Sequence, residues 1–384
     1  MPPRVLYDLS LLGFCNDNPA KITGMPRVIL EQAVRLQTSP DCDTTFCATE
    51  DQADTYRFVH SHPALKRARL AARSEEAMNV LNPAALQDAQ VFHTPHSAVP
   101  DIVRKYPGVS VVQTVYDMIP FLLPETMTAK YLEYYADIVR RIHPADRVIT
   151  ISHSARADFC NYTGFAADRV HVIPLAADEV LFRPCDDLER IAAVRAKHGI
   201  PEGHYLLSVC TFEPRKNLPH LIRSFVELLR AHPELDELTL VLTGGQGWMF
   251  EPILAELAGA ELASGRIVTT GYVPDDDLAL LYSGALAFLY LSLYEGFGLP
   301  PLEAMQCGTP VIVSNTSSLP EVVGDAGILL SPDDQDGLCQ SILDLHRFPN
   351  QRARLANKSL LQAQQFSWEK NVQQTVEVYR LMAR

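Results

Sequence analysis

The sequence has fewer basic than acidic side chains, 33 Lys and Arg against 46 Asp and Glu, for a formal net charge of −13. A protein that binds nucleic acid backbones needs a basic surface, so nucleic acid is excluded as the main partner. The chain contains 8 cysteines, but no Cys-x-x-Cys pair and no His/Cys cluster with metal-binding spacing. This pattern indicates reduced thiols buried as small apolar side chains, and no metal site.

Long apolar runs are also missing. The most apolar stretch, residues 285–294, has about half the length that a membrane-spanning helix needs. The N-terminus reads as a strand, Val5–Leu9, rather than as a charged segment before an apolar run, so no signal peptide is expected. We therefore expect a cytoplasmic protein, with at most peripheral contact at the inner face of the membrane.

A basic run lies in a predicted helix and consists of Lys66, Arg67, Arg69 and Arg73. Two interpretations are open for this run. A solvated helix face is favoured, and docking onto anionic lipid headgroups is the alternative, because basic amphipathic helices commonly bind membrane surfaces.

The phosphate-binding and nucleophile motifs of many nucleotide-using enzymes are absent, with no Walker A loop and no Gly-x-Ser-x-Gly elbow. Residues 244–247 follow a strand but lack the dinucleotide spacing, which is weak support for NAD. Residues 275–277 contain Asp-x-Asp, but their place before an apolar helix favours helix caps over a metal site. Asp41 and Asp43 look like loop aspartates. We predict no cofactor.

Short β-rich apolar segments alternate with longer segments of helical periodicity. The predicted strands are Val5–Leu9, Val91–His93, Ser110–Val115, Arg147–Ile151, Val170–Ile173, Tyr205–Val209, Thr239–Thr243, Ile267–Thr270, Ala287–Leu291, Pro310–Val313 and Ile328–Leu330. Continuously apolar strands separated by helices are typical of buried parallel strands in β-α-β units. The sequence therefore predicts a doubly wound α/β fold, with ligands at the carboxyl ends of the strands.

Length and one irregular connector predict two domains. A chain of 384 residues exceeds one ordinary core. Residues 172–174 end one strand, and residues 182–184 read as an irregular connector before a charged helix. We expect an N-terminal lobe of residues 1–185 and a C-terminal lobe of residues 186–366, facing across a cleft. The final helix, 367–384, is expected to pack back onto the first lobe.

Residues 294–305 are the most informative stretch. They follow a strand and read Glu-Gly-Phe-Gly-Leu-Pro-Pro-Leu-Glu from Glu295 to Glu303. A strand, a glycine-bearing turn and a helix start form an anion site, because free backbone N–H groups and the helix dipole face a phosphate. Gly296 and Gly298 let the backbone approach a ligand closely. We expect one carboxylate near a sugar and the other on ribose hydroxyls, the alternative being a plain turn with surface glutamates.

A second stretch, Arg215-Lys216, follows the strand Tyr205–Val209 and precedes a helix. An adjacent Arg and Lys at the carboxyl end of a strand suit a diphosphate, since Arg supplies forked hydrogen bonds and Lys a point charge. A solvated basic pair is the alternative, and the nearby glutamate pattern makes it less favoured.

The N-terminal half offers candidates for the acceptor side. His93 ends one predicted strand and His96 follows it, and Tyr116 and Asp117 follow another predicted strand. A histidine pair at a strand end is more often structural, but Asp117 or a histidine is a candidate to handle the proton of an acceptor hydroxyl. Gly24 lies in a turn before a helix and is a candidate for reaching phosphate, with weak support from spacing.

Taken together, these motifs resemble the retaining glycosyltransferases of family 4, which have the GT-B fold. Residues 295–303 look like that family's paired-glutamate motif, and Arg215-Lys216-Asn217 matches its diphosphate element. Residues 307–312 and 319–324 match the strand and helix that follow, and residues 172–184 resemble the interdomain connector. The resemblance covers nearly the whole chain, and its specific part lies in the C-terminal half.

The resemblance implies how the donor is held. Arg215 and Lys216 would bind the diphosphate, and Glu295 would contact the donor sugar near its anomeric centre. The backbone that would cradle the diphosphate belongs to Phe297, Gly298 and Leu299. Transfer in this family retains anomeric configuration, and the two cations would balance the leaving group, which removes the need for a metal ion.

The rest of the donor would contact Glu303, through its ribose hydroxyls, and the Tyr272–Val273 loop, through its base.

Two departures from the family concern the acceptor-facing lobe. Many relatives carry His-Asp where this chain has Tyr116-Asp117, and tyrosine cannot replace a cationic imidazole. Many also carry two glycines in the first turn, where this chain has only Gly24.

The resemblance therefore implies a retaining hexosyltransferase that moves mannose or glucose from a GDP- or UDP-linked donor. Its acceptor would be a glycan or lipid-linked glycan in surface polysaccharide biosynthesis. A non-catalytic nucleotide-sugar-binding or partner-binding protein of the same fold is the alternative from another class. A sugar-nucleotide epimerase or a phosphorylase on the same scaffold is the alternative among enzymes.

Overall fold

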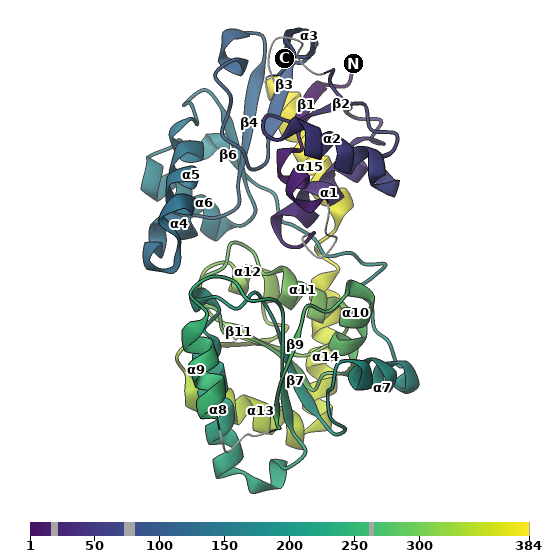
Figure 1. Ribbon diagram of the computed structural model, residues 1–384, viewed down its shortest axis with the longest axis vertical. Coiled ribbons are helices and arrows are strands. Elements are labelled where there is room, and N and C mark those ends of the chain that lie inside the picture. The colour runs from purple at the N-terminus through teal and green to yellow at the C-terminus, as the bar shows by residue number, and fades with distance from the viewer. Residues whose placement is uncertain (17–21, 73–80, 261–264, 384) are drawn as a thin grey trace. The chain divides into compact units, whose positions relative to one another are not determined.

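The computed structural model describes residues 1–16, 22–72, 81–260 and 265–383 (Figure 1). The chain divides into two compact units. The first unit comprises Met1–Pro120, Ala129–Leu175 and Trp368–Arg384, and the second comprises Phe121–Thr128 and Ala176–Ser367. The main boundary thus lies after Leu175, against the sequence expectation of residue 185, and the last helix belongs to the first unit.

The first unit is built on a six-stranded parallel sheet in the order β2-β1-β3-β4-β5-β6. Its strands are β1 (Arg4–Asp8), β2 (Asp43–Cys47), β3 (Val91–Thr94), β4 (Ser110–Val115), β5 (Arg147–Thr150) and β6 (Val170–Val172). Its helices include α1 (Met25–Leu36), α2 (Gln52–Ser61), α3 (Pro83–Asp88), α5 (Ala129–Arg140), α6 (His153–Thr163) and α15 (Trp368–Met382). The chain passes from this unit to the second within α4 (Ile119–Leu122).

The second unit has the same architecture, with the strand order β12-β11-β10-β7-β8-β9. Its strands are β7 (Tyr205–Val209), β8 (Thr239–Thr243), β9 (Ile267–Gly271), β10 (Ala287–Tyr290), β11 (Val311–Ser314) and β12 (Ile328–Leu330). Its helices include α7 (Leu188–Lys197), α8 (Leu218–Ala231), α9 (Glu251–Gly259), α10 (Asp275–Gly284), α11 (Leu299–Gln306), α12 (Leu319–Val323), α13 (Gln335–Arg347) and α14 (Pro349–Ala363).

The apolar runs predict the strands well because both faces of each sheet are covered. Every strand predicted from them is present, with ends that shift by no more than one residue. In the first unit, Leu6 and Phe92 belong to one core cluster, while Tyr7 and Val91 belong to another. Since neighbouring strand residues point to opposite faces, the sheet separates two apolar layers.

The helix α15 packs into the second of these layers. Val376 and Tyr379 belong to its core cluster. The Asn371 side chain accepts a hydrogen bond from Gln32 at 2.9 Å and donates one to the Pro174 carbonyl oxygen at 2.8 Å. Buried apolar and amide contacts together therefore hold the end of the chain on the first unit.

The strand β2 is missing from the sequence prediction, which placed Asp43 in a loop. Asp43 instead begins β2 and pairs in register with Arg4 of β1. An edge strand has only one neighbour and can stay half polar, so its run contains too few apolar residues to stand out.

The basic run after residue 65 is not a helix, which corrects the prediction. A three-residue 3-10 turn, Pro63–Leu65, precedes Lys66 and Arg67. Arg69 forms an ion pair with Asp43 at 2.5 Å, and Arg73 lies outside the described residues. Among the described residues, every helix falls short of the length and apolar character that crossing a bilayer requires.

Candidate active site

The two motif-bearing loops meet because of the strand order in the second unit. The strands β7 and β10 are neighbours in the sheet, although β8 and β9 lie between them in sequence. Strand order reverses between β7 and β10, and ligands of doubly wound folds bind at the carboxyl ends of strands at such a reversal. Arg215 and Lys216 follow β7, and Glu295 follows β10.

The loop after β7 is fastened to the loop after β10. Asn217 has a left-handed backbone with φ 57°, a conformation that Asn tolerates better than most residues. Its amide nitrogen donates to the carbonyl oxygens of Leu291 at 3.2 Å and Pro332 at 2.7 Å. The backbone N–H of Leu293 donates to the Arg215 carbonyl oxygen at 2.9 Å. The two loops therefore hold each other in register.

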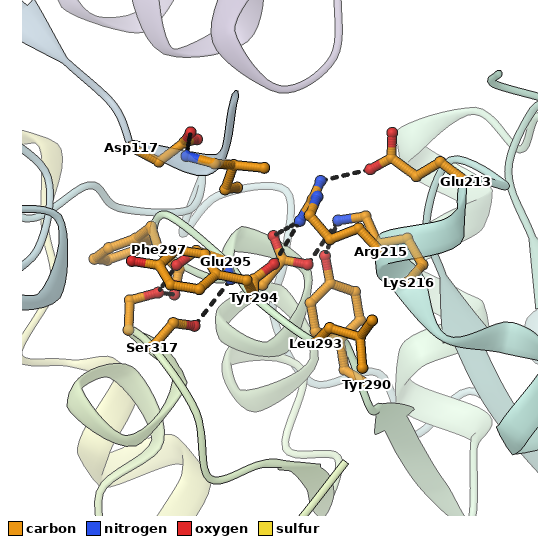
Figure 2. Close-up of polar contacts among 12 residues, drawn as sticks. Asp117, Glu213, Arg215, Lys216, Tyr290, Leu293, Tyr294, Glu295, Phe297 and Ser317 are labelled. Atoms are coloured by element: carbon orange, nitrogen blue, oxygen red, sulfur yellow. Dashed lines mark hydrogen bonds and ion pairs between the residues drawn. The ribbon is translucent and has the colours of Figure 1, made fainter. Parts of the chain in front are cut away.

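Glu295 lies between the two cations (Figure 2). Its Oε2 is 2.7 Å from Nη1 of Arg215, and its Oε1 is 2.7 Å from Nζ of Lys216. The side chain of Glu295 is 9% exposed, and that of Lys216 also 9%. Ion pairs this far from solvent are screened little by salt.

The pKa of Glu295 is lowered to about 2. Burial acts in the opposite direction and is the largest single influence, but the charges of Arg215 and Lys216 together outweigh it. Glu295 is therefore a carboxylate at every physiological pH, and the site holds a fixed negative charge between two fixed positive ones.

Tyr290 and Glu213 complete this cluster, and the sequence analysis gave neither a role. The Lys216 ammonium donates to the Tyr290 hydroxyl at 2.8 Å, and Arg215 forms an ion pair with Glu213. Tyr290 is the last residue of β10, and Glu213 follows β7 by a few positions. Their positions at strand carboxyl ends are the only sequence signal that could have found them.

The turn between β10 and α11 offers backbone donors. Gly298, with φ 119°, precedes the first residue of α11. Within the described residues, the N–H groups of Phe297, Gly298 and Leu299 have no hydrogen-bond acceptor. Pro300 and Pro301 have no N–H, so these three consecutive groups are the donors that this helix start can offer to an anion.

The other predicted donor contacts are distributed along the same edge. Glu303 is 5% exposed, and its Oε2 accepts a hydrogen bond from the buried Tyr282 hydroxyl at 3.0 Å. Burial, followed by the Glu303 charge, raises the pKa of Tyr282 well above its usual value, so this hydroxyl stays protonated. Tyr272 is 47% exposed after β9, and Val273 is buried.

Asp275, Asp276 and Asp277 lie within the first turn of α10 rather than before it. The helix N-cap is Pro274, without a side-chain cap, so the expected capping role is wrong while the favourable position for the helix dipole holds. Asp277 pairs with Lys197 at 2.7 Å. In the described part of the chain, no group of three or more His, Cys, Asp and Glu side chains could hold a metal ion.

In the first unit, His93 is a core residue. Its Nδ1 lies 2.6 Å from the Tyr379 hydroxyl and its Nε2 lies 2.8 Å from that of Thr114, so both ring nitrogens are occupied. Burial lowers the pKa of His93 to about 3. His96 packs against the ring of Tyr134, with centroids 5.6 Å apart, and burial lowers its pKa to about 4. Both imidazoles are therefore neutral, and His93 is tied to α15 through Tyr379.

Tyr116, Asp117 and Gly24 also belong to the first unit. The Tyr116 hydroxyl is buried and has no hydrogen-bond partner in the described parts of the chain, and burial raises its pKa. Asp117 accepts a hydrogen bond from the Ile119 backbone at 3.0 Å, at the start of α4. Gly24 precedes α1 with φ 55°, and a Cβ added there would meet nothing within 4 Å.

Two doubly wound parallel-sheet units, one of them with paired cations and free N–H groups at the strand-order reversal, define the class of GT-B glycosyltransferases. Residues 191–362 match the family of glycosyl transferases group 1, and residues 22–180 match glycosyltransferase family 4. The chain belongs to this family of glycosyltransferases.

The chain is 34% identical over 316 residues to the O-antigen chain mannosyltransferase B of Escherichia coli, and this match covers 80% of each chain. It is 31% identical over 326 residues to the serotype-specific mannosyltransferase WbdA of Escherichia coli, with 84% of this chain and 39% of that protein covered. The solved structure of Anabaena HepE in complex with UDP superimposes with a TM-score of 0.72 at 18% identity, covering 98% of this chain and 99% of that one. This last likeness concerns the fold.

Proposed function

We propose that this glycosyltransferase moves a hexose, mannose in preference to glucose, from a nucleotide-diphosphate donor to a glycan or lipid-linked glycan acceptor. The observation that carries the proposal is the meeting of Arg215, Lys216 and Glu295 beside three backbone N–H groups that have no acceptor in the part of the chain that the structure describes. Mannose is favoured because two relatives named above are mannosyltransferases, one of them for the O-antigen chain. GDP and UDP both remain candidates for the nucleotide.

In this proposal the diphosphate shares Arg215 and Lys216 with Glu295 and accepts hydrogen bonds from the N–H groups of residues 297–299. Charge-assisted and backbone contacts of this kind stabilise the negative charge that grows on the leaving oxygen. Glu303 binds the ribose hydroxyls, and the Tyr272–Val273 loop lines the base. Two fixed cations supply the positive charge that a metal ion would otherwise provide.

Transfer proceeds with retention. The bond between the anomeric carbon and the diphosphate oxygen breaks, and its electron pair goes to that oxygen. The acceptor oxygen attacks the same face through a short-lived oxocarbenium-like ion pair, and its proton passes to the departing diphosphate. Glu295, held as a carboxylate, stabilises the positive charge at the anomeric carbon. Asp117, Tyr116 and His96 are the acceptor-side candidates, and Gly24 is a candidate for a phosphate contact.

The test combines thermal unfolding and mass spectrometry, with EDTA present, across GDP- and UDP-linked mannose and glucose. A donor at 100 times its dissociation constant stabilises the protein by about 2.7 kcal/mol, which raises Tm by several degrees. One donor should produce this shift, and mass spectrometry should detect its slow hydrolysis. The anomeric configuration of the transferred sugar, read by NMR, tests retention.

Lys216→Ala should reduce the Tm shift, because the diphosphate would lose a charge-assisted contact. Lys358→Ala is the matched control, since Lys358 lies in the same unit and pairs with the exposed Asp325. Equal shifts in the two variants would contradict the role of Lys216. Binding without turnover, in the presence of candidate acceptors, would favour the non-catalytic alternative.

A further inference from the structure

A serine-rich loop after β11 holds the turn that carries Glu295. The Ser317 hydroxyl oxygen accepts a hydrogen bond from the Glu295 backbone N–H at 2.9 Å (Figure 2). The Ser318 hydroxyl donates to the carbonyl oxygens of Glu295 at 2.9 Å and Phe297 at 2.7 Å. The Thr316 hydroxyl donates to the Leu293 carbonyl oxygen at 3.1 Å. Three consecutive side chains therefore contact one short turn.

Ser317 has an unfavourable backbone conformation. Its φ is 51°, in the left-handed region that non-glycine residues seldom occupy. Strain of this kind persists where the surrounding structure enforces it, and it concentrates at functional sites. The hydrogen bond to the Glu295 N–H is a contact that this conformation allows, and a glycine would adopt the same φ without strain.

The Ser318 side chain does not cap the helix that it precedes. It is the N-cap of α12, where a serine side chain usually accepts a hydrogen bond from the first turn, but it makes no such cap. Its fully buried hydroxyl is directed to the Glu295 turn instead. The helix α12 therefore lacks a side-chain cap, and the Glu295 turn has the hydrogen bond instead.

We propose that Ser317 and Ser318 are positioning residues for sugar transfer. They set the backbone from which the Glu295 carboxylate reaches Arg215 and Lys216, and they orient the N–H groups of residues 297–299. The inference rests on the proposed function of this site. A carboxylate displaced by about 1 Å can cost about 10²-fold in rate, so the effect should be larger on kcat than on donor binding.

The main variant is Ser317→Gly. Glycine accepts φ 51° and removes the hydroxymethyl side chain with its hydrogen bond. A purely structural role of the hydroxyl therefore predicts a lower Tm, with kcat lost only as far as the fold is lost. The positioning role predicts a fall in kcat of about tenfold or more with Tm unchanged or raised, and a smaller change in donor KM. Ser317→Asn keeps an oxygen acceptor and tolerates this φ, so it should restore part of kcat.

The matched control is Asp51→Gly in the first unit, where φ is 42° and the side chain makes no helix cap. It relieves the same kind of strain far in sequence from the site, and its kcat should equal that of the unchanged protein. Ser318→Ala tests the second hydroxyl, with the same expected fall in kcat.

Full kcat in both Ser317→Gly and Ser318→Ala would overturn the positioning role and leave the proposed function intact. A loss of kcat that follows a loss of Tm would also overturn it, in favour of a structural role. If the unchanged protein binds and transfers no donor, the proposed function itself fails, which is a different result.

Discussion

The two units are both built on a six-stranded parallel sheet, but their strand orders differ and they use the strand-order reversal differently. In the second unit the reversal lies between β7 and β10. Cations, a carboxylate and N–H groups without an acceptor among the described residues meet there. In the first unit it lies between β1 and β3, where the buried Asp8 accepts hydrogen bonds from the hydroxyls of Ser10 at 2.6 Å and Thr49 at 3.0 Å. The first unit thus uses this edge for hydrogen bonds within the protein, whereas the second unit holds cations and N–H donors there, which supports the proposed donor site.

The units also differ in charge. Acidic and basic residues balance in the first unit, so the whole formal net charge of −13 lies in the second. In the proposed function, an anionic donor would therefore be held through the local cluster of Arg215, Lys216 and backbone N–H groups rather than through the overall field of the unit. Loss of one charge of this cluster should therefore weaken donor binding more than a change of charge elsewhere on the surface.

The largest expected effect is that of Glu295→Gln, a change that keeps the shape and removes the charge. Transfer should fall by about 10²–10³-fold, the range typical of losing one preorganised electrostatic contact to a transition state. Single-turnover transfer from the donor identified by thermal shift measures this effect. Asp8→Asn in the first unit is the matched control, because it alters another buried carboxyl group and should leave single-turnover transfer unchanged. Equal losses in both variants would remove the contrast between the units.

The next effect is a difference in acid stability. His93 and His96 in the first unit have pKa values lowered by burial to about 3 and about 4 from 6.5. The unfolded chain takes up protons on them near pH 6.5, so the first unit loses stability as pH falls from 6.5 toward these values, by on the order of a few kcal/mol. Glu295 has a lowered pKa, so its contribution is lost only between about 4.5 and about 2.

The two tryptophans report on the units separately, since Trp368 lies in the first and Trp248 in the second. The Trp248→Phe variant reports on the first unit and the Trp368→Phe variant on the second. Denaturant unfolding followed by fluorescence should show a larger fall in the unfolding free energy of the first unit between pH 6.5 and 4.5. The exposed His204 and the half-buried His220 of the second unit have pKa values lowered in the same direction, so the contrast is one of degree. Parallel pH profiles would contradict it.

The smallest effect compares two glycines. Gly298→Ala and Gly164→Ala both place a Cβ at positive φ, at 119° and 70°, and each should cost about 1–2 kcal/mol of stability. The new Cβ at Gly298 would also meet Leu319 at 2.9 Å, whereas that at Gly164 meets nothing within 4 Å. Only Gly298→Ala should therefore weaken donor binding, through displaced N–H groups. Calorimetric titration with the donor measures this difference.

The sequence predicts the fold with little error because buried parallel strands are continuous apolar runs, as Tyr205–Val209 and Thr239–Thr243 illustrate. It misses β2, whose edge position permits a polar run, and it assigns a helix to the basic run after Leu65. For the candidate site, the resemblance to a family motif predicts roles for Arg215, Lys216 and Glu295, and the structure brings these three side chains together. It gives no role to Tyr290 and Glu213, whose residue types carry no motif.

The sequence by itself determined the two α/β units, the family and the chemical groups of the candidate donor site. Only the tertiary structure decided which of these groups meet. β7 and β10 become neighbours through the strand order, and Ser317 and Ser318 reach Glu295 from a separate loop. The structure likewise placed His93 in the core, against a helix nearly three hundred positions later in the chain. Local patterns fix secondary structure, but a site depends on contacts between distant segments, which no single segment encodes.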